Sequence, residues 1–194
     1  MKYIRFLLIL PLIIFASLFL IGGSCTGNSP QNDVTLIAFF KLDPLATYLH
    51  LCSEPTDPWY EDGAQDAVPI VLSDYNIIPG DSLLIEVEGE FFNGNNERAR
   101  VIAVFSTNGT LLDGSELHRV PGAIEAGEDF VSIGTYGCGG EATDIPEDFY
   151  CTPSVSIAVP TGATHLFICA RDSYYEDNTD ANNDFGVTIS KYNE

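Results

Sequence analysis

Basic residues are scarce in this chain. Its 194 residues include 8 Lys and Arg against 28 Asp and Glu, for a formal net charge of −20 at pH 7. Such an excess of acid repels phosphate backbones and anionic lipid headgroups, so it disfavours nucleic-acid binding and electrostatic binding to membranes. Cations and neutral polar ligands remain as classes of partner.

Signatures of catalysis are also missing. The motifs GxSxG, HExxH, GxGxxG and the P-loop do not occur, and the three His residues are scattered at positions 50, 118 and 165. A carboxylate pair for glycoside hydrolysis is defined by spatial separation rather than by sequence, so a small glycoside hydrolase stays an alternative. A short, strand-rich chain leaves little room for a substrate cleft, and we expect the protein not to be an enzyme.

A long apolar run occurs only at the N-terminus. Lys2 and Arg5 precede an apolar stretch over residues 6–21, and small residues follow as far as Ser24. A positive start, an apolar centre and a small-residue exit are typical of a secretory signal, so residues 1–24 are predicted to be a signal peptide. The run is shorter than the roughly 20 apolar residues of a spanning helix.

The end of this leader resembles a bacterial lipoprotein lipobox. The resemblance lies in Ile21-Gly22-Gly23-Ser24-Cys25, although Gly22 stands where such lipoboxes usually have an aliphatic residue. It implies that Cys25 is the lipid-modified first residue of the mature chain, with 25–33 as a polar tether and 34–194 as a single domain in the cell envelope. Membrane contact would then be made only through the lipid. Ordinary cleaved secretion is the alternative.

Cysteines are few, and none lies in a CxxC pair. Besides Cys25, the chain has Cys52, Cys138, Cys151 and Cys169. An even number of cysteines in an oxidising compartment predicts two disulfides. Three pairings are possible, and we favour Cys138 with Cys151, which bracket one Gly-rich acidic loop, leaving Cys52 to join Cys169. A metal–thiolate site is the less favoured alternative because the spacings are long.

Helical periodicity is lacking after about residue 52. Short strand patterns alternate with turn residues, as in Leu84–Glu88, where the carboxylates fall on one face and Ile85 and Val87 on the other. Strands are predicted at Val68–Leu72, Leu83–Phe92, Arg100–Ser106, Asp129–Ile133, Val155–Val159, His165–Ala170 and Phe185–Ser190. The pattern predicts an all-β fold, an antiparallel two-sheet β-sandwich of the jelly-roll kind. Val34–Phe40 fits either a first strand or the start of a helix.

One basic residue of the predicted domain stands in a long connection between strands. Only six basic residues remain when Lys2 and Arg5 are left out, and Arg119 is one of them. In so acidic a domain we expect Arg119 to form an ion pair with a nearby carboxylate.

Acidic residues concentrate in one predicted loop between two strands. Five carboxylates lie within it, those of Asp172, Glu176, Asp177, Asp180 and Asp184. Carboxylates held this close repel one another unless a cation or solvent relieves them, and Ca²⁺ takes about six to eight oxygen ligands. The loop therefore indicates a Ca²⁺ site or, alternatively, a solvated turn. It is not an EF-hand, because Phe185 and Lys191 stand where Gly and Glu are needed.

The same loop carries a resemblance to a known family. Leu166–Asn178, closed by Phe185–Ile189, resembles the terminal calcium loop of bacterial LecA-like galactose-binding lectins, and Ile77–Asp81 is similar to that family's first turn. The resemblance spans roughly residues 68–189. It implies a galactose-binding-like β-sandwich with Ca²⁺ as the cofactor. Its implied ligands are the side chains of Asp172, Asp177 and Asn178 and the carbonyls of Tyr175 and Ile77.

Sugar contacts are less well marked. Calcium with open positions binds vicinal sugar hydroxyls, and Asp172 and Asn178 would hydrogen-bond the same hydroxyls. The family's sugar-gripping His and Gln have no clear equivalent, with His118 as a loose candidate. Trp59 could stack on a sugar ring or plug the end of the sandwich. Together, the sequence and these resemblances predict an exported lipoprotein with a β-sandwich that binds calcium, and the resemblance to the lectins implies a glycan as its ligand. The alternative is a passive envelope or adhesion protein without a sugar site.

Overall fold

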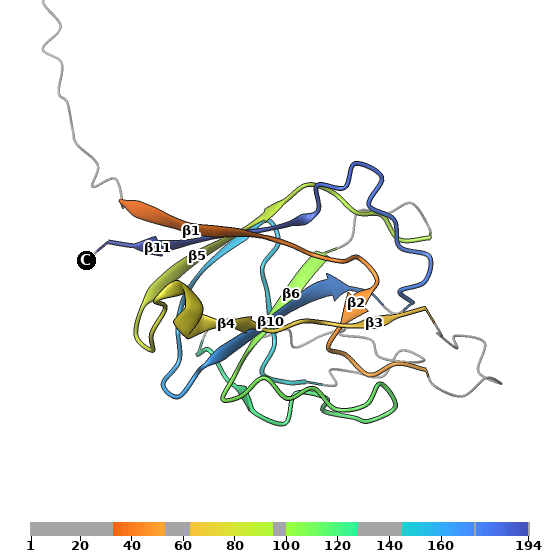
Figure 1. Cartoon of the computed structure of the whole chain (residues 1–194), viewed down its shortest axis with the longest axis horizontal. Coiled ribbons are helices and arrows are strands. Elements are labelled where there is room, and N and C mark those ends of the chain that lie inside the picture. The colour runs from red at the N-terminus through yellow and green to blue at the C-terminus, as the bar shows by residue number, and fades with distance from the viewer. Residues whose placement is uncertain (1–32, 53–62, 95–99, 128–144, 173, 194) are drawn as a thin grey trace, which may run out of the picture. The chain divides into compact units, whose positions relative to one another are not determined.

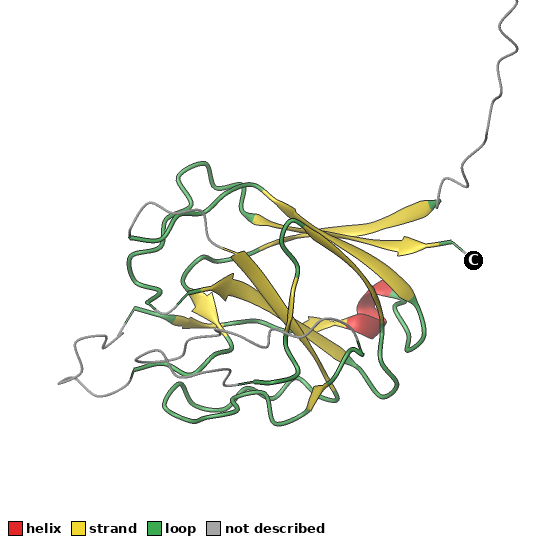
Figure 2. Cartoon of the chain, turned by 180° about the vertical axis from the view of Figure 1, so that it is seen from behind, coloured by secondary structure: helices red, strands yellow, loops and turns green. Residues whose placement is uncertain are grey.

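The computed structural model of the chain describes residues 33–52, 63–94, 100–127, 145–172 and 174–193. Strands and loops make up nearly all of this part, with one short helix (Figure 2). Within these ranges, no helix has the length and apolar character needed to cross a bilayer. Residues Asn32–Glu194 form one compact unit.

The first sheet has four strands in the order β1–β11–β5–β9, all antiparallel (Figure 1). Their bounds are β1 Val34–Lys41, β11 Gly186–Tyr192, β5 Ser82–Glu88 and β9 Ser154–Ala158. The segment that fitted a strand or a helix start is therefore an edge strand. Its register shifts between Leu36 and Ala38, where a bulge inserts an extra residue.

The second sheet has β10 and β6 at its centre. Its order is β4–β10–β6–β7, and β8 also pairs with β6. The bounds are β4 Ile70–Val71, β10 His165–Arg171, β6 Arg100–Ser106, β7 Ala123–Ile124 and β8 Phe149–Tyr150. A separate parallel pair is formed by β2 (Ala46–Thr47) and β3 (Gln65–Asp66), and one turn of 3-10 helix, η1, spans Leu72–Tyr75. Two antiparallel sheets of this kind confirm the predicted all-β, two-sheet class.

The main core lies between the two sheets. Alternate residues of β5, such as Leu83 and Ile85, face alternate residues of β6, such as Ala103 and Phe105. The aromatic rings of Phe105 and Phe149 stack there, with centroids 5.6 Å apart. Burial of these side chains is the principal stabilising contribution, at about 25 cal/mol for each Å² of apolar surface removed from water.

A second core covers the outer face of the second sheet. It is defined by Tyr48, Leu49, Ala67, Ile102, Val104, Val120, Ile145, Phe167 and Cys169. Ile102 and Val104 alternate with the β6 residues of the main core, so β6 is buried on both faces. This explains why its sequence is a continuous apolar run rather than an alternation. The loops that carry Tyr48 and Val120 therefore act as a third layer.

Arg119 ties these covering loops together. Its side chain is fully buried, and Nε donates to the Leu112 carbonyl at 3.0 Å while Nη1 donates to the Leu49 carbonyl at 2.8 Å. Nη2 forms an ion pair with Asp66, whose side chain is 70% exposed. The expected ion pair of Arg119 is thus confirmed. A guanidinium suits this position because it can donate to several acceptors at once.

The predicted disulfides of Cys151 and Cys169 are wrong. Both thiols are free and buried. Cys151, directly after β8, faces the main core, whereas Cys169 on β10 faces the second core and lies 3.6 Å from the hydroxyl of Thr47. Cys52 is disulfide-bonded, but to neither of these two, and Cys138 lies outside the described residues. Sequence spacing could not reveal that the thiols point to different faces of one sheet.

Candidate functional site

The acidic loop lies at one end of the sandwich, between β10 and β11. It runs alongside the segment that follows β5, where Phe92 and Thr179 exchange backbone hydrogen bonds of 3.0 and 2.9 Å. Farther along, the Glu90 amide donates to Asp184 Oδ1 at 3.4 Å. The loop is therefore held by backbone pairing as well as by its own turns.

Asn178 is an enclosed polar side chain within this loop, only 6% exposed. Its Nδ2 donates to the Pro44 carbonyl at 3.0 Å, and its backbone amide donates to the Tyr175 carbonyl at 3.1 Å. The other amide atom, Oδ1, is shielded from solvent and accepts no hydrogen bond from the described residues. A buried acceptor left in this state costs about 1–3 kcal/mol, so a donor or a cation at Oδ1 would be stabilising.

Asp172 supplies a second shielded oxygen. The residue follows β10, and its Oδ1 accepts the Tyr174 amide at 3.4 Å while its own amide donates to the Tyr175 hydroxyl at 3.4 Å. Its Oδ2 is inaccessible to solvent. Two of the side chains predicted as calcium ligands thus have an oxygen enclosed within the protein.

Tyr175 connects these two residues. It is buried, and its hydroxyl donates to the Ala170 carbonyl at 3.1 Å. Burial raises its pKa well above the usual tyrosine value, so the ring stays neutral and acts as a structural prop. Its carbonyl, the atom predicted to bind calcium, already accepts the Asn178 amide. A carbonyl oxygen has a second lone pair that can still meet a cation.

Asp177 has a different environment. Its side chain is exposed and lies against Gly94, where an added Cβ would overlap the carboxylate. Glycine at position 94 therefore allows the two segments to approach closely. The structure places Asp177 at the surface of the loop, unlike Asn178.

Ile77 is not brought to this loop. Its amide donates to the Leu72 carbonyl at 3.1 Å. The Leu72 amide in turn donates to the carbonyl of Thr164, the residue just before β10 begins. The loop follows the other end of β10, about 20 Å away for a strand of this length. The turn after Ile77 is closed by Asp81, whose Oδ2 accepts the Ile78 amide at 2.9 Å and whose Oδ1 pairs with Lys191 at 2.7 Å. The implied carbonyl ligand is therefore in the wrong place.

The other carboxylates of the loop help to fold it. Glu176 accepts the Gly63 amide at 2.6 Å and the Tyr174 hydroxyl at 3.1 Å. Asp180 accepts the backbone amides of Asp184 and Phe185, each at 3.2 Å. Part of the acidic cluster is thus explained by local hydrogen bonds, as in many Asp-rich turns.

A hollow of about 420 Å³ opens beside this loop. It is lined by Lys41, Leu42, Asp43, Pro44, Asp180 and Asn183. Lys41 Nζ donates to Asn183 Oδ1 across it. The hollow adjoins the Pro44 carbonyl that holds Asn178. Sequence reasoning missed the 41–44 segment, and no local signal could have revealed it, because its place beside the loop follows from the pairing of β1 with β11.

The remaining candidate sugar contacts are Trp59 and His118. Trp59 lies outside the described residues. His118 is exposed on a different loop, next to the buried Arg119, with a φ of 52°. Among the residues that are described, no three His, Cys, Asp or Glu side chains are grouped so as to hold a metal ion. A site here would depend on amide and carbonyl oxygens together with carboxylates.

No protein-family model, characterised protein or solved structure matches this chain.

Proposed function

We propose that the protein is an exported, lipid-anchored β-sandwich that binds Ca²⁺ at the loop between β10 and β11. Asn178 Oδ1 carries the proposal, because it is an oriented and shielded oxygen with no hydrogen-bond donor among the described residues. The side chain of Asp172 would be the second ligand and supply negative charge. Ile77 is no longer in the proposed ligand set.

Calcium suits this end better than magnesium. The available atoms are an amide oxygen, a carboxylate and backbone carbonyls in an irregular loop, and Ca²⁺ accepts such mixed oxygen ligands in flexible geometry. Magnesium prefers a rigid octahedron and retains several waters. The resemblance of the loop to LecA-like lectins supports the same ion. It also supports a glycan as the ligand that the bound calcium would meet, with the cell envelope as the location.

Calorimetric titration of residues 26–194 with CaCl₂ tests the calcium site. We expect saturable binding, and at 100 times the dissociation constant the ion should stabilise the fold by about 2.7 kcal/mol, visible as a rise in Tm. Asn178→Ala and the milder Asp172→Asn should each weaken binding. Asp113→Asn is the matched control, since Asp113 accepts the Ser115 amide on another loop.

The absence of both binding heat and a calcium-dependent Tm rise in the unaltered protein would refute the site. A glycan array read with and without EDTA then tests the sugar. Binding that EDTA abolishes supports calcium-mediated recognition, and an array with no signal leaves calcium as a purely structural ion.

A further inference from the structure

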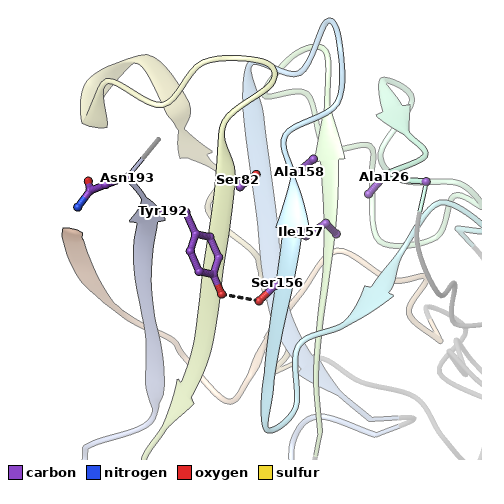
Figure 3. A pocket seen from close by; sticks show the side chains of 8 residues that line it. Ser82, Ala126, Ser156, Ile157, Ala158, Tyr192 and Asn193 are labelled. Carbon is purple, nitrogen blue, oxygen red and sulfur yellow. Dashed lines mark hydrogen bonds between the residues drawn. The ribbon is translucent and has the colours of Figure 1, made fainter. Parts of the chain in front are cut away.

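A second hollow lies on the first sheet, at the end of the strands away from the proposed calcium loop (Figure 3). It encloses about 520 Å³ and is lined by residues that include Ser82, Gly127, Ser156, Ala158, Tyr192 and Asn193. Gly186, where the calcium loop ends, pairs with Glu88, whereas Lys191 pairs with Leu83 at the opposite end of β5. The two regions are therefore separated by about the length of a seven-residue strand, roughly 20 Å.

Most of the hollow lies over the outer face of this sheet, and at the edge strand β9 it also reaches Ile157, Ala126 and Gly127. Ser82 pairs with Ala158, and Leu84 pairs with Ser156, so these four side chains share one face. The residues between them, Leu83 and Ile157, point into the main core. Small side chains on β5 and β9 leave the space open.

Tyr192 forms one wall of this hollow. Its side chain extends from β11 across β5, and its hydroxyl meets Ser156 Oγ on β9 at 2.8 Å (Figure 3). The hydrogen bond spans three strands and holds the half-buried ring along the sheet. An aromatic ring fixed in this way offers an apolar surface to a ligand without a further loss of side-chain freedom.

The chemistry of the lining selects the class of ligand. Hydroxyls, an amide and small apolar groups line the hollow, and no charged side chain is among its lining residues. A cation would find no carboxylate there, and an anion would be repelled by a chain of net charge −20. A neutral ligand with many hydroxyls and one apolar face matches these groups, and a pyranose ring has that character.

We infer that this hollow binds a neutral saccharide, with Tyr192 stacked against the sugar ring and the serine hydroxyls hydrogen-bonded to it. This site is separate from the proposed calcium site, because its lining residues lie at the other end of the strands and include no carboxylate. It requires no Ca²⁺.

Affinity electrophoresis of the full-length chain, in a non-ionic detergent without a sugar headgroup, tests this site. The gels contain a neutral galactomannan, a mixed-linkage β-glucan or soluble starch, with polygalacturonate as the anionic control, and each is run both with and without EDTA. We expect at least one neutral polysaccharide to retard the protein. Tyr192→Ala should weaken the retardation by about tenfold or more, whereas Tyr192→Phe, which keeps the ring, should change it by less than about threefold.

A second variant guards against misfolding. Ala158→Gln fills the hollow from an exposed position of β9 while leaving Tyr192 intact, and it should also weaken retardation about tenfold with an unchanged Tm. Leu117→Ala, at an exposed residue of another loop, should bind normally. The inference is overturned if no neutral polysaccharide retards the protein, if Tyr192→Ala and Ala158→Gln bind as well as the unaltered chain, or if EDTA abolishes binding. The last result would instead favour the calcium loop.

Discussion

The outer faces of the two sheets differ in how they meet solvent. On the first sheet, the strands present Ser, Thr and Glu together with exposed apolar residues of β1, among them Leu36 at 64% and Phe39 at 50% exposure. On the second sheet, β6 and β10 present Ile102, Val104 and Phe167, all covered by loops. One sheet thus keeps an outer face that meets solvent, and the other needs a third layer to remove its apolar face from water.

This difference assigns separate roles to the loops. Those held by Arg119 close the second core, and their polar groups are used internally. The loop around Asn178 and the hollow beside Tyr192 both adjoin the first sheet, and these are the regions that we propose for binding. A burial pattern along a strand therefore indicates which face of the sandwich is available for function.

Among the substitutions that test this difference between the two faces, removal of the Arg119 side chain should lower the free energy of unfolding most. Arg119→Ala leaves the carbonyls of Leu49 and Leu112 without their donor and Asp66 without its partner. We expect a loss of about 3–5 kcal/mol in the free energy of unfolding, measured by urea denaturation. Lys191→Ala, which breaks the Asp81 pair at a half-exposed position, is the control and should cost far less. Equal losses would show that Arg119 does not secure the third layer.

Truncation of one side chain on each outer face should sharpen the contrast. Ile102→Ala in the second core should cost about 2–4 kcal/mol, since it removes buried methyl groups and leaves a cavity. Leu36→Ala on the first sheet should change stability by less than about 0.5 kcal/mol. The same denaturation measurement compares them, and similar values would mean that the outer face of the first sheet is also covered.

Ionisation of the two free thiols, those of Cys151 and Cys169, should have the smallest effect on the free energy of unfolding at neutral pH. Burial raises the pKa of Cys169 from 9.0 to about 12, and burial also raises the pKa of Cys151. Neutral thiols favour the folded state below the unfolded pKa of about 9, and this contribution is lost as pH rises from 9 towards 12. Urea midpoints should therefore fall over that range, and both thiols should resist iodoacetamide at pH 8 until the protein unfolds. Rapid alkylation of the folded protein would contradict their enclosure.

Several elements could be read directly from the sequence. The predicted Arg100–Ser106 coincides with β6, and the predicted His165–Ala170 and Phe185–Ser190 overlap β10 and β11 closely. These strands are long and have strong alternating or continuous apolar patterns, which are local properties. The expected strand at Val68–Leu72 is reduced to the two residues of β4, and the predicted Asp129–Ile133 lies outside the described residues.

The candidate site was only partly predictable. The clustering of acids and amides indicates the loop, and the resemblance of that loop to LecA-like calcium loops implies Asp172 and Asn178 as ligands within it. The partner of Asn178, the Pro44 carbonyl, is 134 positions away in the chain and leaves no trace in the local pattern. The carbonyl of Ile77 was wrongly predicted as a ligand for the same reason. A turn that resembles a family motif does not show which end of a neighbouring strand it lies beside.

By itself, the sequence determined the acidic charge, the all-β class and the central strands, because composition and side-chain periodicity act over a few neighbouring residues. Only the tertiary structure decided the cover over the second sheet, the partners of Arg119 and the free state of Cys151 and Cys169. Those features depend on contacts between segments that are distant in the chain, and burial in such contacts is what makes a single arginine or thiol structural rather than exposed.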